Sequence, residues 1–395
     1  MINLLYCTYY DLNTTNAAYN RIKHLSEALK VHGINITIVG SGSSSGSWLQ
    51  RNLKGFQQIL FNRKNFTSIR HSKSMRFIAE ASKFYKQNLK ELIKTYNISG
   101  IIIYAPQGEM VEPIIRISKQ LGIYVAADCG EYYDFSFHYL LNGMLFQQAY
   151  FKYFQMKKLN GITYSAHNTW DKKAQALNLP NVHIPSITNF KKIFRTSPSL
   201  KNKKINIVFM GRLSSREMPG VIFDALKICK NDGLQFNFKL IGTKNDSYKE
   251  KYWINILNNI KELRGLIQIY GFVTNEKRDE ILAESDIFIM LRPNKKEIEH
   301  IFPFRIPEFM MSGNLVITSK VPPLKLYLEE NHGVKFISSS NNSLELAKLI
   351  INLAENPLKR FQIGLDGRKY ALKHFSFDTI GKRLSKFLKG LKYSD

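Results

Sequence analysis

The chain has 395 residues, which is too many for one compact core, so two domains are expected. Its 57 Lys and Arg against 31 Asp and Glu give a formal charge of +26, which points to nucleic acid, acidic lipid or phosphorylated substrates. Three cysteines have no metal-ligand or disulfide spacing, and neither a signal peptide nor an apolar run of the roughly 18 residues of a membrane span is visible. We therefore expect a soluble or peripheral protein of a reducing cytosol.

The first half of the sequence alternates short apolar runs with helical patterns. Strands are expected at 3–9, 34–39, 100–104, 123–127, 161–164 and 182–185, and helices at 20–33, 75–96, 111–121 and on either side of 161–164. Continuous apolar strands that alternate with helices are typical of parallel sheets buried on both faces.

The same alternation restarts after a polar, basic segment, 191–204, which we interpret as an interdomain linker. Strands are expected at 205–210, 236–241, 267–270, 287–291, 315–318 and 334–337, and helices at 219–230, 247–263, 276–284, from 344 onward and, in a basic amphipathic tail, at 375–391. The pattern predicts two doubly wound, Rossmann-like α/β domains, 1–190 and 205–374, with a ligand in the cleft at the carboxyl ends of their sheets.

Arg305 and Glu308 are three residues apart on a short helix that follows a predicted strand and ends at Gly313. The helix dipole and Arg305 suit a phosphate, and Glu308 suits ribose hydroxyls. The alternative is an ordinary exposed ion pair.

Gly211-Arg212 ends the strand at 205–210, where glycine lets a ligand approach the backbone and an arginine can pair with a diphosphate. A surface arginine at a strand end is the alternative. Similar segments recur at later strand ends, namely Leu240-Ile-Gly242, Ile269-Tyr-Gly-Phe-Val273, Ser285-Asp286-Ile287 and Pro303-x-Arg305-x-x-Glu308.

This series of segments resembles the carboxyl-terminal domain of the GT-B glycosyltransferases of the retaining family four (group 1). The resemblance covers 206–391 well and the amino-terminal half loosely, and it implies a GT-B fold whose last helix, within 375–395, crosses back to the first domain. It also implies that Arg212 and Arg305 hold the donor diphosphate and stabilise it as it leaves. Glu308 would bind the ribose, the backbone of Gly271, Phe272 and Val273 would border the base, and Arg216 would add a phosphate contact. No Asp-x-Asp occurs, so we expect no metal and no cofactor.

Three positions depart from the family pattern. Glu217 stands where the family has a second cation, and His300, beside Glu299, stands where it has a glutamate that contacts the donor sugar. The amino-terminal Gly-Gly loop is replaced by Thr15-Asn16-Ala17-Ala18, and Asn16 could still present its backbone N–H to phosphate.

Carboxylates of the first domain could serve the acceptor. Asp128 and Glu131 follow a buried strand, where they could accept a proton from the acceptor hydroxyl or, alternatively, cap the next helix. His167 lies after another strand end, as an acceptor-side group or a hydrogen-bonding wall.

The segment 41–95 holds 11 Lys and Arg, two Glu and seven interleaved aromatic residues. Docking on an anionic membrane is the favoured interpretation. A solvated face over core aromatics and a nucleic-acid groove are the alternatives, and no nucleic-acid partner is expected.

The resemblance implies a hexosyltransferase on the inner face of the plasma membrane. It would move a sugar from a nucleotide donor, expected to be UDP-linked, to a lipid-linked or oligosaccharide acceptor of the cell surface, with retention of configuration. The alternatives are a GT-B epimerase or hydrolase of the sugar nucleotide and a catalytically silent GT-B subunit that binds a glycan or a partner.

Overall fold

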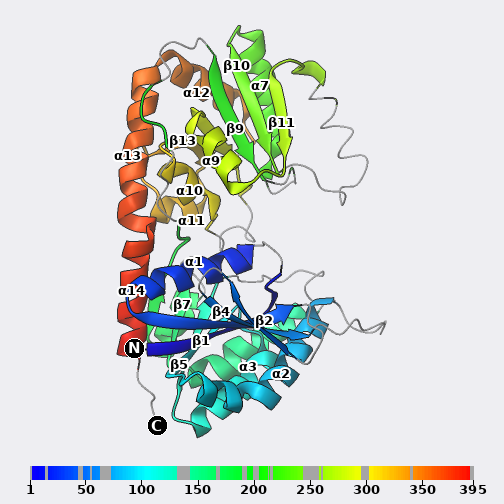
Figure 1. Ribbon diagram of the computed structural model, residues 1–395. Coiled ribbons are helices and arrows are strands. Elements are labelled where there is room, and N and C mark those ends of the chain that lie inside the picture. The colour runs from blue at the N-terminus through cyan, green and yellow to red at the C-terminus, as the bar shows by residue number, and fades with distance from the viewer. Residues whose placement is uncertain are drawn as a thin grey trace. The chain divides into compact units, whose positions relative to one another are not determined.

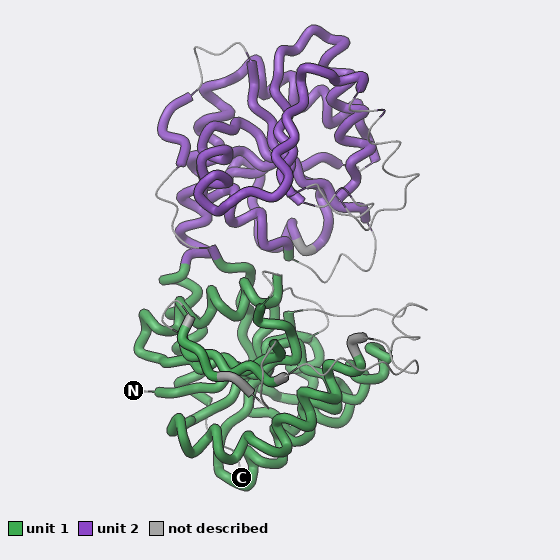
Figure 2. The backbone as a smooth tube through the Cα atoms, turned by 45° about the vertical axis from the view of Figure 1, so that its right-hand side comes forward, with its two compact units in different colours: residues 1–187, 300–302, 377–395 green, residues 188–299, 303–376 purple. Residues whose placement is uncertain are grey.

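The computed structural model describes residues 2–13, 17–42, 48–53, 56–62, 73–130, 143–165, 170–188, 194–198, 204–211, 213, 217–242, 258, 261–294, 302–338 and 341–391. The chain divides into two compact units (Figure 2). The first comprises residues 1–187, 300–302 and 377–395, and the second comprises residues 188–299 and 303–376. The chain thus enters the second unit at Thr188, shortly before the segment that we interpreted as a linker.

The first unit is built on an eight-stranded sheet of order β3-β4-β2-β1-β5-β6-β7-β8. All neighbouring strands are parallel except β3 and β4. β5 and β6 are buried along their whole length, which explains why they read as uninterrupted apolar runs. The strands are β1 Ile2–Asp11, β2 Ile34–Gly42, β3 Trp48–Leu53, β4 Phe56–Asn62, β5 Gly100–Tyr104, β6 Tyr124–Cys129, β7 Gly161–Tyr164 and β8 Asn181–His183.

The hairpin of β3 and β4 was not predicted. It lies in the segment that we interpreted as a membrane-docking stretch, and β4 extends the sheet beside β2. β4 does not read as an apolar strand in the sequence, because the polar residue Gln58 interrupts it. In the structure Gln58 is buried and hydrogen-bonded to Arg51 at 2.9 Å. Phe61, Phe84 and Tyr85 belong to the core. For these three aromatic residues the alternative interpretation, in which they are core residues beneath a solvated face, is confirmed.

Helices cover both faces of the first sheet (Figure 1). α1 lies on one face, α2 and α3 lie on the other, and α14 packs along α1. Gly381 of α14 permits that close approach, because a Cβ there would lie 2.8 Å from the carbonyl oxygen of Ala28. The helices are α1 Ala17–Val31, α2 Lys73–Thr95, α3 Gly108–Gln120, α5 Met144–Tyr150, a π-helical turn Phe151–Gln155, a 3₁₀ turn Met156–Lys158, α6 Trp170–Ala176 and α14 Phe377–Gly390.

The second unit has a six-stranded, fully parallel sheet of order β11-β10-β9-β12-β13-β14. Its strands are β9 Ile205–Met210, β10 Phe236–Ile241, β11 Ile267–Gly271, β12 Ile287–Met290, β13 Leu315–Ser319 and β14 Val334–Ile337. Its helices are α7 Pro219–Asn231, α9 Asn275–Ala283, α10 Arg305–Met311, α11 Pro322–Tyr327, α12 Ser343–Glu355 and α13 Pro357–Phe375. Most of the helix expected at 247–263 lies outside the described residues.

The tail helix begins later than its apolar stripe suggested. α13 runs through Phe375, and Ser376 then takes an extended conformation and bridges Thr188. α14 therefore starts at Phe377 rather than at Phe375, and it places Ile380, Leu384 and Leu388 in the core of the first unit.

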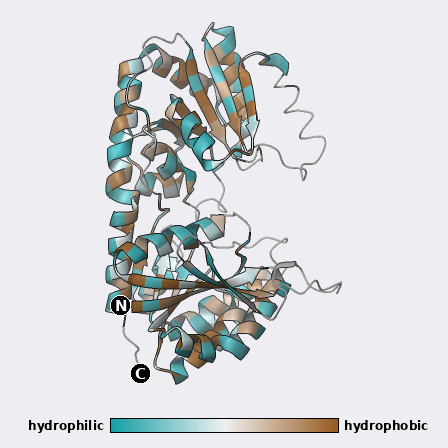
Figure 3. Cartoon of the chain, viewed as in Figure 1, coloured by the Kyte–Doolittle hydropathy of each residue, from teal (hydrophilic) through white to brown (hydrophobic). Residues whose placement is uncertain are grey.

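Each unit has its own apolar core. Figure 3 shows hydrophobic residues along the strands of both sheets. The first core joins strand residues to α1, α2, α3 and α14, and the second joins β9, β10, β12 and β13 to α7 and α12. These cores hold the strand ends in fixed positions, and the candidate site is built from those strand ends.

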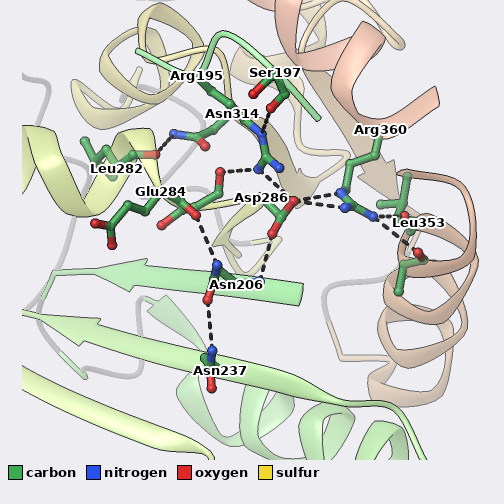
Figure 4. Close-up of polar contacts among 12 residues, drawn as sticks. Arg195, Ser197, Asn206, Asn237, Leu282, Glu284, Asp286, Asn314, Leu353 and Arg360 are labelled. Atoms are coloured by element: carbon green, nitrogen blue, oxygen red, sulfur yellow. Dashed lines mark hydrogen bonds and ion pairs between the residues drawn. The ribbon is translucent and has the colours of Figure 1, made fainter. Parts of the chain in front are cut away.

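Asp286, one residue before β12, anchors part of the predicted linker to the second unit (Figure 4). The carboxylate is buried, contacts Arg195 at 2.6 Å and Arg360 at 2.9 Å, and accepts the backbone N–H of Asn206 at 2.9 Å. Burial lowers the pKa of Arg360, and the Asp286 charge opposes that shift. The segment 194–198 is therefore fixed through Arg195, and the Ser285-Asp286 motif has a structural role here.

Candidate functional site

Three glycines occupy the carboxyl ends of neighbouring strands in the second unit. Gly211 follows β9, Gly242 follows β10 and Gly271 ends β11, with φ of +143°, +74° and +62°. L side chains rarely adopt such angles. Among the described residues, a Cβ at Gly271 would meet nothing within 4 Å, and one at Gly242 would meet only the backbone of Gly211, at 3.9 Å. In the described part of the chain, this edge of the sheet thus presents backbone that no side chain covers, as a bulky flat ligand requires.

Arg305 lies directly beside the first of these glycines. It opens α10, and its Nη1 donates a hydrogen bond to the carbonyl of Met210, the last residue of β9. A Cβ at Gly211 would collide with the guanidinium group, so a larger residue there would displace it. The structure therefore brings together Gly211 and Arg305, two residues that the sequence placed in one site.

Glu217 joins Arg305 to a second arginine that the sequence analysis missed. Glu217 Oε1 lies 2.5 Å from Arg305 Nη2 and 3.1 Å from Arg292 Nη1. Arg292 follows β12, the strand next to β9, and its backbone N–H donates to Ser319 Oγ at 2.9 Å. Following each predicted strand to its carboxyl end would have found Arg292, because such ends meet at one edge of a parallel sheet.

Glu308 is one helical turn from Arg305 and contacts Arg278 of α9 at 3.0 Å. Arg278 is another residue that the sequence reading missed. Phe272, just after β11, is 78% exposed, and Gly271 and Val273 on either side of it are partly exposed. An exposed aromatic ring beside an open backbone edge is suited to stacking against a planar base.

Seven predicted site residues lie outside the described residues. They are Asn16, Glu131, His167, Arg212, Arg216, Glu299 and His300.

Asp128 is enclosed in the first unit. It is 1% exposed, and it accepts hydrogen bonds from Arg21 at 2.8 and 2.9 Å, from Tyr6 at 2.5 Å and from Thr163 at 2.8 Å. Arg21 is fully buried and also donates to the carbonyls of Ile184 and Pro185. With four donors on its two oxygens, this carboxylate has no direction left for an acceptor hydroxyl, so the geometry favours a structural role over the predicted catalytic one.

The hydrogen bonds around Asp128 connect a neutral phenol, that of Tyr6, with a charged guanidinium group, that of Arg21. Burial, followed by the Asp128 charge, raises the pKa of Tyr6 well above its usual value. Burial alone would lower the pKa of Arg21, but the Asp128 carboxylate outweighs this effect and raises it. Tyr6 thus remains a hydrogen-bond donor and Arg21 a cation, and both contact the Asp128 carboxylate.

Exposed lysines follow one face of α2. Lys83, Lys86, Lys90 and Lys94 are all exposed, as their spacing of three and four residues predicted. Lys86 borders a surface hollow of about 630 Å³ together with Phe146 and Tyr150, which are 65% and 44% exposed. Phe146 and Tyr150 belong to α5, which lies outside the segment predicted to dock on a membrane.

The π-helical turn Phe151–Gln155 continues the same aromatic surface. Tyr153 and Phe154 are each 59% exposed, and Lys152 and Lys173 lie over the Tyr153 ring, with Nζ 5.5 and 5.1 Å from its centre. We call Phe146, Tyr150, Tyr153 and Phe154 the aromatic patch.

Among the described residues, no group of three or more His, Cys, Asp or Glu side chains could hold a metal ion. No helix in that part of the chain is long and apolar enough to cross a bilayer.

Residues 190–370 match the model of the family described as Glycosyl transferases group 1. A comparison with curated proteins found no match. Among solved structures, the chain is similar to sucrose-phosphate synthase from Thermosynechococcus elongatus, with TM-score 0.72, 14% identity and 98% of each chain covered. It is also similar to Anabaena HepE in complex with UDP and glucose, with TM-score 0.69, 14% identity, and 99% of this chain and 100% of that one covered. The chain is similar as well to the apo form of the lipopolysaccharide outer core galactosyltransferase WaaB. Here the TM-score is 0.66 and the identity 10%, and 98% of this chain and 99% of that one are covered. At these identities the likeness establishes the fold.

Proposed function

We propose that the chain transfers a sugar from a UDP-linked donor to a growing glycan. Residues 190–370 match the family of group 1 glycosyl transferases, and the two-domain α/β fold matches that of GT-B glycosyltransferases, as the sequence predicted in both cases. The acceptor we propose is a lipid-linked glycan destined for the cell surface. We place the reaction at the inner face of the plasma membrane, and we expect retention of anomeric configuration.

One observation carries the donor half of this proposal. Arg305, its neighbour Arg292 and the bare backbone of Gly211 meet at the carboxyl edge of the second sheet. Guanidinium groups pair with phosphate oxygens through parallel hydrogen bonds, and bare backbone allows a ligand to approach closely. Phe272 and the Gly271 backbone then border the base, and Glu308 is one turn from Arg305, where a ribose would follow the diphosphate.

In the proposed reaction the bond between the anomeric carbon and the phosphate oxygen breaks while a bond to the acceptor oxygen forms. The acceptor hydroxyl approaches on the face that the leaving phosphate occupies, and a phosphate oxygen takes its proton. Negative charge therefore grows on the departing nucleoside diphosphate. Arg305, held in place by the Met210 carbonyl, stabilises that charge where it develops.

The structural neighbours support the donor and the acceptor class. HepE was solved with UDP, with UDP-glucose, and with UDP and glucose, which supports a uridine donor. WaaB is described as a lipopolysaccharide outer core galactosyltransferase, which supports an acceptor at the cell envelope. These descriptions concern HepE and WaaB themselves, and that this chain uses the same classes of donor and acceptor is our proposal.

The membrane part of the proposal depends on the first unit. Lys86, one of the exposed lysines of α2, lines the same hollow as Phe146 and Tyr150 of the aromatic patch. Amphipathic aromatic rings suit the interface of a bilayer, and lysines suit its anionic headgroups.

A thermal-shift panel of UDP-, GDP-, CMP- and dTDP-sugars tests the donor class. A ligand that binds only the native state raises the apparent stability, by about 2.7 kcal/mol at one hundred times its Kd. We expect UDP-sugars to raise the melting temperature and the other three classes to leave it nearly unchanged. If none of the four shifts the wild-type protein, the donor site is misassigned.

A further inference from the structure

We propose that Glu217 competes with the donor diphosphate for Arg292 and Arg305, so that donor binding must displace its carboxylate, and that Arg292 is a second guanidinium of the donor site. The inference rests on the proposed function and deepens it. It assigns a residue that restrains donor affinity.

The contacts of Glu217 place its charge where a phosphate is expected. One oxygen, Oε1, serves both arginines, at 2.5 Å from Arg305 Nη2 and 3.1 Å from Arg292 Nη1. A single anionic oxygen that bridges two guanidinium groups is also how a phosphate oxygen would bind to this pair. Glu217 and a diphosphate therefore cannot occupy the same donors at once.

The other carboxylate oxygen of Glu217, Oε2, does little to stabilise the group in this position. Glu217 is 5% exposed, and among the described residues its buried Oε2 has no hydrogen-bond partner. A buried, unsatisfied carboxylate oxygen is costly, so within the described part of the chain the two arginines alone stabilise the group in this position. When a diphosphate takes the arginines, nothing else seen in the described residues holds the carboxylate there.

The backbone beside Glu217 is strained. Met218 has φ +50° and ψ +48°, a conformation that side chains other than glycine, Asn and Asp seldom adopt. It precedes α7 and has no side-chain cap at that helix end. Glu217 is thus held next to a strained residue at the start of α7.

Arg305 does not depend on Glu217 for its position. Its Nη1 donates to the Met210 carbonyl, and Gly211 leaves room for the guanidinium group. Arg292 is fixed at its backbone by Ser319. Both cations therefore remain at the strand ends when the carboxylate leaves, and they become available to the ligand.

Isothermal titration of the full chain with UDP and with inorganic diphosphate tests the inference. Glu217→Gln keeps the shape and removes the charge, so both probes should bind about tenfold more tightly than to wild type, the scale of one charge-assisted hydrogen bond. Glu217→Ala should change affinity in the same direction. Arg292→Gln should weaken both probes by a similar factor. Glu284→Gln is the matched control, because it removes an acid that is ion-paired to Lys239 in the same unit, and it should bind as wild type does.

The outcomes separate the inference from the function on which it rests. If wild type binds UDP and Glu217→Gln binds it equally or more weakly, Glu217 positions the arginines and the inference is wrong, while the donor site stands. If neither wild type nor Glu217→Gln binds UDP or diphosphate, the proposed function falls together with the inference.

Discussion

Arg21 and Asp128 are 107 positions apart in the chain and form a buried, two-pronged ion pair with distances of 2.8 and 2.9 Å. The pair joins α1 to β6, and through Ile184 and Pro185 it also holds the chain after β8. A buried ion pair of this kind is strongly destabilising when one partner is removed, because the other charge stays buried without compensation.

The first prediction follows from that pair. Asp128→Asn should lower the free energy of unfolding by about 3–5 kcal/mol, because it leaves the Arg21 guanidinium uncompensated. Glu27→Gln on the same α1 helix removes the acid of a partly exposed pair with Lys23, and it should cost at most about 1 kcal/mol. Denaturant unfolding of both variants is the measurement. A fully stable Asp128→Asn enzyme that has lost turnover would instead support the catalytic role expected from the sequence.

A second prediction concerns the arginines of the donor site. Arg305→Ala and Arg212→Ala should each lower transfer by at least ~100-fold, the scale of losing one contact to charge that develops in the transition state. Arg264→Ala, at an exposed turn before β11, is the control and should keep wild-type rates. Initial rates with a radiolabelled donor decide the matter, and near-wild-type rates in both site variants would mean that the assigned site is wrong.

The third prediction is that transfer survives EDTA. No Asp-x-Asp occurs in the sequence, and we expect guanidinium groups to supply the charge that a metal supplies in other folds. Transfer rates should stay within about twofold of the untreated rate, a margin far below the loss expected for removing one transition-state charge contact. Loss of transfer in chelator, with recovery on adding Mg²⁺ or Mn²⁺, would contradict the arginine mechanism.

The fourth prediction concerns the membrane. The protein should co-sediment with phosphatidylglycerol vesicles, and less so as the Debye length falls from about 10 Å at 0.1 M salt to about 3 Å at 1 M. Changing Lys83, Lys86, Lys90 and Lys94 to Gln should weaken binding. The control changes four exposed lysines of the second unit to Gln, namely Lys230, Lys277, Lys348 and Lys359, and loses the same charge.

A companion variant tests the aromatic patch. Phe146→Ser with Phe154→Ser should reduce the binding that remains at high salt, where apolar contact dominates. Wild-type protein that does not pellet even at low salt would refute docking on this surface.

The fifth prediction concerns the thiols. Burial raises the pKa of Cys7 and Cys229 to about 12, and it raises that of Cys129 well above its usual value. At pH 8 only about one in 10⁴ of the thiols with pKa near 12 is ionised, so native protein should resist N-ethylmaleimide. All three should react quickly in guanidinium chloride, as mass spectrometry would show. Rapid labelling of the native protein would mean that these cores open readily.

The sequence was informative where a pattern repeats locally. β9 to β14 were expected because buried parallel strands read as apolar runs, and the glycines at 211, 242 and 271 mark the ends of three of them. β4 was missed because Gln58 interrupts its apolar run, and this buried residue is hydrogen-bonded to Arg51 and to Tyr19 of α1, 39 positions earlier in the chain.

The pairing of charged groups was the least predictable part. Asp128 after a strand suits catalysis, capping and burial equally, until Arg21 from the amino-terminal helix is seen to reach it. One signal was present, because Arg21 shares a helix face with Leu25 and Ala28, which point inward. Glu217 was noticed as a departure from the family, but its partner Arg292 is 75 residues further on and needed the folded sheet.

The place of α14 in the first unit has a consequence for synthesis on the ribosome. The first core includes Ile380, Leu384 and Leu388, which are translated only after the whole second unit. At ~5–20 residues per second, the segment 188–376 takes roughly 10–40 s to make. During that interval the nascent first unit lacks the helix that covers α1, so this apolar face is open to chaperones. A stand-alone first unit should therefore be made by fusing 377–391 to 1–187, rather than by ending the chain at 187.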